Sequence, residues 1–139
     1  MTWTLTGFAD EASPDFAEQM ALLNSLGVRH LEFRSAWRTN ILDLDEQQLT
    51  DAEAMLAAAG VTVSSIGSPI GKIKISRDLE PHLDRVRHAA RLANRFGARY
   101  VRVFSFFIDQ DDDPDRHRDE VIRRMAAIAR IAEEHDVVA

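Results

Sequence analysis

Four short stretches rich in apolar and β-branched residues alternate along the chain with segments whose apolar residues recur at helical spacing. The expected strands cover residues 4–9, 28–33, 61–66 and 100–104. Each of the first three helical segments is followed by a glycine, and these three glycines are Gly27, Gly60 and Gly97. Glycine in this position is typical of the left-handed residue that ends a helix. The pattern therefore predicts a repeated strand–helix unit.

Helix starts are marked by capping residues. Ser13-Pro14 predicts the start of the first helix, and Asp45 with Gln48 three residues later predicts a capping box for the second. The third helix is expected from about Pro81 to Phe96, and the acidic run 109–113 with Pro114 is expected to precede the fourth. Asp136 takes the place of the helix-ending glycine, so 137–139 is expected to begin a fifth strand.

Alternating strands and helices imply parallel strand pairing, which occurs in open doubly wound sheets and in barrels. The strands of an open sheet are apolar on both faces, whereas here polar residues alternate with apolar ones, as in His30-Leu31-Glu32-Phe33-Arg34. The other strands are expected to send Thr6 and Phe8, Ser64 and Ile66, and Arg102, Phe104 and Phe106 to the same polar face. We therefore expect four consecutive βα units of a (β/α)8 TIM barrel plus the start of a fifth strand, in one α/β domain covering residues 1–139. A flavodoxin-like open parallel sheet is the alternative.

Such a barrel needs about 250 residues, and the chain has 139. The expectation is that these residues are the N-terminal half of a longer chain, since half a barrel leaves two strand edges and one sheet face uncovered. A half-barrel that associates with itself through its open edges is the less favoured interpretation.

Composition removes several classes of function. The absence of cysteine excludes disulfides, thiolate zinc sites and a cysteine nucleophile, and a net charge of −6 without a basic stripe argues against nucleic acid as a partner. No apolar run approaches the roughly 20 residues of a membrane span. Residues 1–5 lack the features of a signal peptide. These observations predict a cytoplasmic protein with no membrane partner.

Four segments carry a resemblance to a known family. The segments are Gly7-Phe8-Ala9-Asp10-Glu11, 30–34, Ser65-Ile66-Gly67-Ser68-Pro69-Ile70-Gly71-Lys72 and 102–107. Together they are similar to the xylose isomerase-like sugar (phosphate) isomerase/epimerase family. The resemblance implies a metal-dependent isomerisation or epimerisation, in which a proton moves next to a carbonyl through an enediolate, on a small sugar or sugar phosphate. It implies a divalent cation (Mn²⁺, Mg²⁺ or Co²⁺) for the full-length protein. In the family most metal ligands and proton-transfer glutamates lie on strands five to eight, so the main catalytic and metal residues are expected beyond Ala139. No metal ligand is assigned to this segment, which is expected to be inactive alone and to bind no metal tightly.

The candidate substrate-binding residues lie at or after the expected strand ends, where barrel enzymes place their sites. Glu32 either lines the site or forms an interior ion pair with Arg34 or Arg102. Paired carboxylates such as Asp10 and Glu11 can bind a metal or share a proton, but the favoured interpretation is that they prepare the start of the first helix. Lys72 either reaches a substrate phosphate or belongs to a surface turn, and Phe106 either walls the site or packs in the core. The full set is Asp10, Glu32, Arg34, Ser68, Lys72, Ser105 and Phe106.

The histidines argue against a nuclease. The related apurinic-site endonucleases carry metal-binding histidines on early strands, but here His82, His88, His117 and His135 fall on expected helices and are predicted to be surface residues. His30 lies near the start of its strand. The other alternative, a flavodoxin-like receiver, requires an aspartate at the end of the third strand, where this chain has Ile66-Gly67-Ser68.

Overall fold

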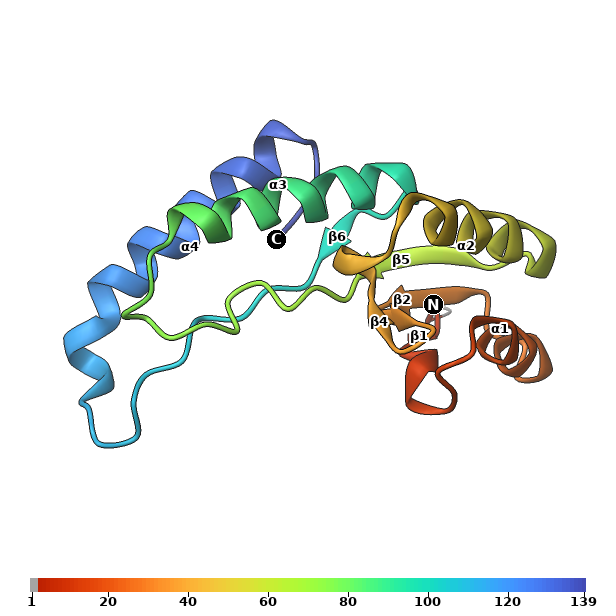
Figure 1. Cartoon of the computed structure of the whole chain (residues 1–139), viewed down its shortest axis with the longest axis horizontal. Coiled ribbons are helices and arrows are strands. Elements are labelled where there is room, and N and C mark those ends of the chain that lie inside the picture. The colour runs from red at the N-terminus through yellow and green to blue at the C-terminus, as the bar shows by residue number, and fades with distance from the viewer. Residues whose placement is uncertain (1–2) are drawn as a thin grey trace.

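The computed structural model describes residues 3–139; Met1 and Thr2, which begin the segment without signal-peptide features, lie outside them. Its main sheet has four parallel strands in the spatial order β1-β2-β5-β6 (Figure 1). The strands are β1 (Thr6–Gly7), β2 (His30–Phe33), β5 (Thr62–Ile66) and β6 (Tyr100–Val101). A small antiparallel hairpin, β3 (Ser35–Ala36) and β4 (Thr39–Asn40), follows β2.

The sequential strand order decides between the two expected architectures. In a flavodoxin-like sheet the first strand lies between the second and the third, whereas here β1 is at the edge and each strand pairs with the next one in the sequence. This order is that of a TIM barrel, of which the described strands form four consecutive units. The α/β half-barrel prediction is confirmed.

The helices form an arc along one side of the sheet (Figure 1). They are α1 (Phe16–Ser25), α2 (Glu46–Ala59), α3 (Glu80–Arg95) and α4 (Arg118–Glu134), with 3₁₀ turns at η1 (Ala9–Glu11), η2 (Ile41–Asp43) and η3 (Pro114–His117). Between residues 3 and 139, none of these helices has both the length and the apolar character needed to cross a bilayer.

The ends of two helices follow the sequence signals closely. The Asp45 carboxylate accepts the Gln48 N–H at 2.8 Å, and the Gln48 side chain accepts the Asp45 N–H at 3.0 Å, which completes the expected capping box of α2. At the end of α4, Asp136 has the left-handed backbone (φ 57°) that Gly60 adopts after α2. Asparagine and aspartate tolerate this conformation better than other non-glycine residues.

The predicted start of α1 is wrong by two residues. Asp15, not Ser13, caps the helix, because its carboxylate accepts the Glu18 N–H at 3.0 Å. The Ser13 hydroxyl instead accepts the Asp15 N–H and donates to the Glu18 side chain. Both residues are good caps, and the sequence alone did not distinguish them.

The expected fourth strand is shorter than predicted, since β6 ends at Val101. Beyond it the chain runs beside the segment that follows β5, and Figure 1 shows the two lying side by side. The Phe104 N–H donates to the Ile70 carbonyl at 2.8 Å, and the Ile75 N–H donates to the Phe107 carbonyl at 2.8 Å. These two extended segments therefore prolong the β5–β6 pairing past the regular sheet.

A β-bulge changes which side chains of β5 face the helices. Leu31 pairs with Val63 but Glu32 pairs with Ser65, so Ser64 is the extra residue. After the bulge Ile66 lies beside Phe33, and both side chains are fully buried. The prediction that Ile66 shares the polar face with Ser64 is wrong, because the additional residue shifts the alternation by one.

The core lies between the sheet and the helices. Phe33 stacks on Phe16 from α1 with 4.9 Å between ring centroids, and it meets Phe96, just after α3, edge-on at 5.4 Å. At the far edge, the Val101 N–H donates to the Val138 carbonyl at 2.8 Å, and Val138 forms a parallel bridge with Tyr100. The predicted start of a fifth strand is confirmed.

Candidate functional site

The carboxyl ends of the four parallel strands meet at one edge of the sheet, which is where TIM-barrel enzymes place their sites. The residues that follow β1, β2, β5 and β6 therefore come together, although they are far apart in the sequence. Five of these side chains alternate between cation and aromatic ring, and we call them the cationic row: Arg34, Phe8, Arg102, Phe104 and Lys72.

The row is continuous. The Phe8 ring centroid lies 4.9 Å from the Arg34 guanidinium and 5.0 Å from that of Arg102. The Phe104 centroid lies 5.0 Å from the Arg102 guanidinium and 4.6 Å from the Lys72 ammonium. Each distance is within the range of a cation–π interaction. Each of the two rings thus contacts two of the three positive charges at the rim.

Arg34 is neutralised at its end of the row. Its Nε donates to the Asp10 carboxylate at 2.7 Å and its Nη2 donates to Glu11 at 2.5 Å. The hydrogen bond that Arg34 donates to Asp10 is the main reason that the pKa of Arg34 is raised. The Ser35 hydroxyl donates to the same Asp10 oxygen. The favoured interpretation of Asp10 and Glu11 as preparation for the first helix did not include this ion pair, in which both carboxylates face Arg34.

Arg102 carries no such neutralising partner. Its Nε donates to the Ser68 carbonyl at 3.3 Å and its Nη2 to the Gly67 carbonyl at 3.1 Å. Within residues 3–139 no carboxylate lies close enough to form an ion pair with it. Burial, followed by the nearby charge of Arg34, lowers the pKa of Arg102. Arg102 is therefore a partly desolvated cation with unused capacity to bind an anion.

Glu32 does not make the ion pair that the sequence suggested. It is half-buried on β2, but among the described residues it forms no salt bridge with Arg34 or Arg102. Arg34 forms ion pairs with Asp10 and Glu11 instead, and Arg102 donates hydrogen bonds to backbone carbonyls. Glu32 acts on Arg102 only at longer range, where its charge partly offsets the lowered pKa.

Two glycines bring the loop after β5 against the row. A Cβ on Gly67 would lie 2.7 Å from the Cβ of Arg34, and one on Gly71 would lie 1.8 Å from the Phe104 carbonyl oxygen. Gly71 also has a left-handed backbone, with φ 86°. The segment 65–72, one of the four that carry the resemblance, thus packs where side chains do not fit.

The remaining candidates from this loop and from the end of the fourth strand have different surroundings. Ser68 is fully buried, and its hydroxyl donates to the Arg102 carbonyl and accepts the Ile70 N–H at 3.2 Å. It shapes the loop and does not face solvent. Lys72 and Ser105 are exposed.

Phe106 does not continue the polar face of the fourth strand as expected. Its ring lies 5.3 Å from the Arg124 guanidinium on α4 and 6.2 Å from the His82 ring on α3, and it is 9% exposed. The chain leaves the strand conformation here, since Phe106 has φ 76°. This backbone turn, which no sequence signal marks, moves Phe106 into the packing beneath the helices.

His82 lies elsewhere than the sequence predicted, and Phe8, Arg102 and Phe104 were not among the predicted site residues. His82 is 8% exposed, so the prediction of a surface histidine is wrong. Its position in α3 turns it toward Gly71, whose N–H it accepts at 2.7 Å. Phe8, Arg102 and Phe104 were identified as polar-face residues, and that alternation was the signal that could have grouped them.

No metal centre forms from these residues. Between residues 3 and 139, no three His, Asp or Glu side chains gather in a way that could hold a metal ion. At the rim, Asp10 Oδ2 and Glu11 Oε1 accept hydrogen bonds from Arg34. The described part of the chain therefore does not fit a metal site by itself, and no chemical step through a metal is assigned to its residues.

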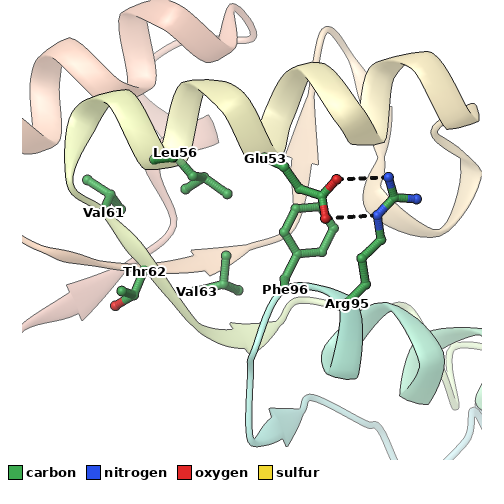
Figure 2. A pocket seen from close by; sticks show the side chains of 8 residues that line it. Glu53, Leu56, Val61, Thr62, Val63, Arg95 and Phe96 are labelled. Carbon is green, nitrogen blue, oxygen red and sulfur yellow. Dashed lines mark hydrogen bonds and ion pairs between the residues drawn. The ribbon is translucent and has the colours of Figure 1, made fainter.

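A hollow of about 240 Å³ lies elsewhere, between α2 and α3 (Figure 2). Leu56, Val63 and Phe96 form its apolar wall, and the Arg95–Glu53 ion pair at 2.9 Å borders it. Because Thr62 at the start of β5 and Val61 just before it also line the hollow, the hollow is at the opposite end of the strands from the cationic row. It gathers none of the candidate residues, so we place the candidate site at the rim.

Comparison with known proteins agrees with this geometry. A family model described as a xylose isomerase-like TIM barrel matches residues 20–139. No curated protein matches the chain.

Solved structures show the same fold at low sequence identity. A xylose isomerase-like TIM barrel protein from Mycobacterium smegmatis, in complex with magnesium, is 23% identical with a TM-score of 0.68, covering 88% of this chain and 44% of its own. A probable 3-DHS dehydratase from Bacillus anthracis is 21% identical with a TM-score of 0.71, and the match covers 99% of this chain and 50% of the dehydratase. A 3-keto-D-glucoside 4-epimerase from E. coli is 14% identical with a TM-score of 0.67, and the match covers 96% of this chain and 53% of the epimerase. The chain thus spans about half the length of each of these structures.

Proposed function

The chain belongs to the xylose isomerase-like TIM barrel family, and from this premise we propose that it is part of a metal-dependent sugar or sugar-phosphate isomerase or epimerase. In this reaction a proton is moved next to a carbonyl through an enediolate. The observation that carries the proposal is the cationic row at the carboxyl end of the strands, and specifically the unpaired guanidinium of Arg102.

The row suits a polyhydroxylated substrate that carries an anionic group. Arginine presents a planar set of donors to a phosphate or carboxylate, and lysine adds a point charge. Arg102 and the exposed Lys72 flank Phe104, so an anion bound by both would lie beside an apolar ring. Such a ring provides a surface for the carbon skeleton of a sugar. We propose that these residues bind and orient the substrate.

We assign no proton-transfer residue and no metal ligand to this chain. The main catalytic residues of the whole protein are proposed to lie beyond Ala139, as the sequence resemblance implies. The magnesium bound to the Mycobacterium smegmatis structure supports a divalent cation for the whole protein, and the Escherichia coli neighbour, an epimerase acting on a keto-glucoside, supports a sugar substrate. Glu32 and Ser105 remain candidate substrate contacts.

Two tests separate binding from catalysis. The protein that contains this chain is assayed for interconversion of aldoses and ketoses, free and phosphorylated, with Mn²⁺, Mg²⁺ or Co²⁺ and after chelation. No turnover of any sugar with any of these metals would contradict the proposed reaction.

The second test measures binding of D-fructose 6-phosphate and D-fructose by NMR titration. We expect the phosphate ester to bind more tightly, and Arg102→Gln and Lys72→Gln each to weaken its binding, by about tenfold or more for Arg102 because hydrogen bonds to charged groups contribute about 1.5–3 kcal/mol. Arg99→Gln, an exposed arginine on the same segment, is the control. Equal binding of both sugars, or wild-type binding by both variants, would refute the role of the row.

Self-association through the open strand edges stays a prediction. Sedimentation velocity of the 139-residue chain measures it directly: a dimer would support this interpretation, and a monomer at high concentration would refute it.

A further inference from the structure

His82 is a buried histidine that the proposed function does not use. It lies in the first turn of α3 and is 8% exposed. Its Nε2 accepts the N–H of Gly71 at 2.7 Å. An imidazole nitrogen that accepts a hydrogen bond carries no proton, so this contact requires the neutral ring with its proton on Nδ1.

Gly71 is one of the residues through which the loop after β5 contacts the fourth strand segment. Its left-handed backbone places it against the Phe104 carbonyl, where a Cβ would lie at 1.8 Å. One residue earlier, the Ile70 carbonyl accepts the Phe104 N–H at 2.8 Å. One residue later, Lys72 places its ammonium 4.6 Å from the Phe104 ring centroid. Fixing Gly71 therefore fixes one end of the cationic row.

Two arginines near the imidazole carry positive charge, and each is paired with a carboxylate: Arg85 with Asp43 at 3.0 Å and Arg124 with Glu120 at 2.6 Å. Arg85 comes from α3 and Arg124 from α4, and both add to the main effect of burial, which lowers the pKa of His82. Arg77 and Asp78, from the segment before α3, line the same hollow of about 280 Å³ as His82 and Arg85. Asp78 is the single acidic group in that lining. The surroundings thus favour the neutral ring that can accept from Gly71.

We propose that His82 is a positioning residue for the substrate-binding loop: its neutral imidazole accepts the Gly71 N–H and holds Lys72 against Phe104. Protonation of the ring places two N–H groups opposite each other, so acid releases the loop. The consequence for substrate binding rests on the proposed function, whereas the link between His82 and the loop does not.

The experiment measures the hydrogen-exchange protection of the Gly71 amide, relative to its intrinsic exchange rate, at pH 8 and at pH 5. The Gly60 amide, bonded at the end of α2, is the internal reference. His82→Gln supplies an acceptor that does not titrate, and His82→Phe fills the space without an acceptor. His88→Gln, on the same helix and only partly buried, is the matched control.

In the wild type and in His88→Gln, we expect protection at Gly71 to be about tenfold lower at pH 5 than at pH 8, which is the effect of losing one buried hydrogen bond. His82→Gln should keep its protection at both pH values, and His82→Phe should lack it at both. If His82→Phe does not fold, the comparison of wild type with His82→Gln still decides. Equal protection of Gly71 at both pH values in the wild type, or loss of the pH effect in His88→Gln, would overturn the proposal.

A second readout separates this proposal from the proposed function. D-Fructose 6-phosphate should bind wild type more weakly at pH 5 than at pH 8, and His82→Gln should reduce this difference. Absence of binding at pH 8 with a protected Gly71 amide would reject the proposed substrate and leave the role of His82 intact.

Discussion

Replacing Gly71 with alanine tests the closest backbone approach at the candidate site. The new Cβ would lie 1.8 Å from the Phe104 carbonyl oxygen and 2.5 Å from its carbon. Both atoms are backbone, so no side-chain rotation relieves the overlap. The loop must move away from the fourth strand segment, and the substitution therefore breaks the interactions that join them.

The size of the effect follows from what is lost. An alanine at φ 86° costs about 1 kcal/mol, because L-residues disfavour the left-handed region. Separation also breaks the hydrogen bonds from Gly71 to His82 and from Phe104 to Ile70, each contributing about 1 kcal/mol. We expect Gly71→Ala to lower the free energy of unfolding by about 3 kcal/mol or more.

Gly60→Ala is the matched control. Gly60 has a similar left-handed backbone, with φ 63°, but no heavy atom lies within 4 Å of its added Cβ. Only the conformational cost of about 1 kcal/mol applies. Urea unfolding followed by circular dichroism gives both free energies, since a chain of this length is expected to unfold in one cooperative step. Equal destabilisation by the two substitutions would refute the close approach at Gly71.

Three further predictions concern the core, the second helix and acid. Phe33→Ala should cost about 3–5 kcal/mol of unfolding free energy because the ring is fully buried. Phe107 is 53% exposed, so Phe107→Ala should change the unfolding free energy by about 0.5 kcal/mol or less. Similar midpoints of urea unfolding for the two variants would contradict this. Asp45→Ala removes the capping box of α2 and should lower the unfolding free energy by about 1 kcal/mol in the same assay. An unchanged unfolding free energy would contradict the stabilising role of this cap. The lowered pKa of His82 means that the unfolded chain binds its proton first, near pH 6.5. Stability should therefore fall as the pH drops from about 6.5 through the folded pKa, and His82→Gln should remove that part of the dependence; an unchanged dependence would refute it.

The local signals in the sequence placed the elements of the fold well, because they depend on near neighbours. Asp45 and Gln48 lie within one helical turn of each other, so the capping box needs no tertiary contact to form. The same holds for the left-handed residues that end the helices. The register of β5 was not predictable in this way, because the bulge at Ser64 arises from pairing with a strand more than 30 residues away.

The candidate site likewise combines features that the sequence predicted with contacts that it did not predict. Alternation along the strands grouped Glu32, Arg34 and Arg102 on one polar face, but the pairing of their charges came from elsewhere. Asp10 and Glu11 take Arg34 because the turn after β1 brings them within 2.7 Å, and Arg102 is left to backbone carbonyls. No spacing in the sequence indicates which carboxylate reaches which arginine.

The repeated strand–helix order, most helix ends and the resemblance to a barrel family were predictable from the sequence, since periodicity and capping are encoded in residues close along the chain. The sequential strand order, the cationic row and the burial of His82 and Phe106 became visible only in the folded chain. These depend on contacts such as that of Gly71 with Phe104, 33 residues apart. Packing in three dimensions brings such pairs together, and neither residue carries a local signal of the other.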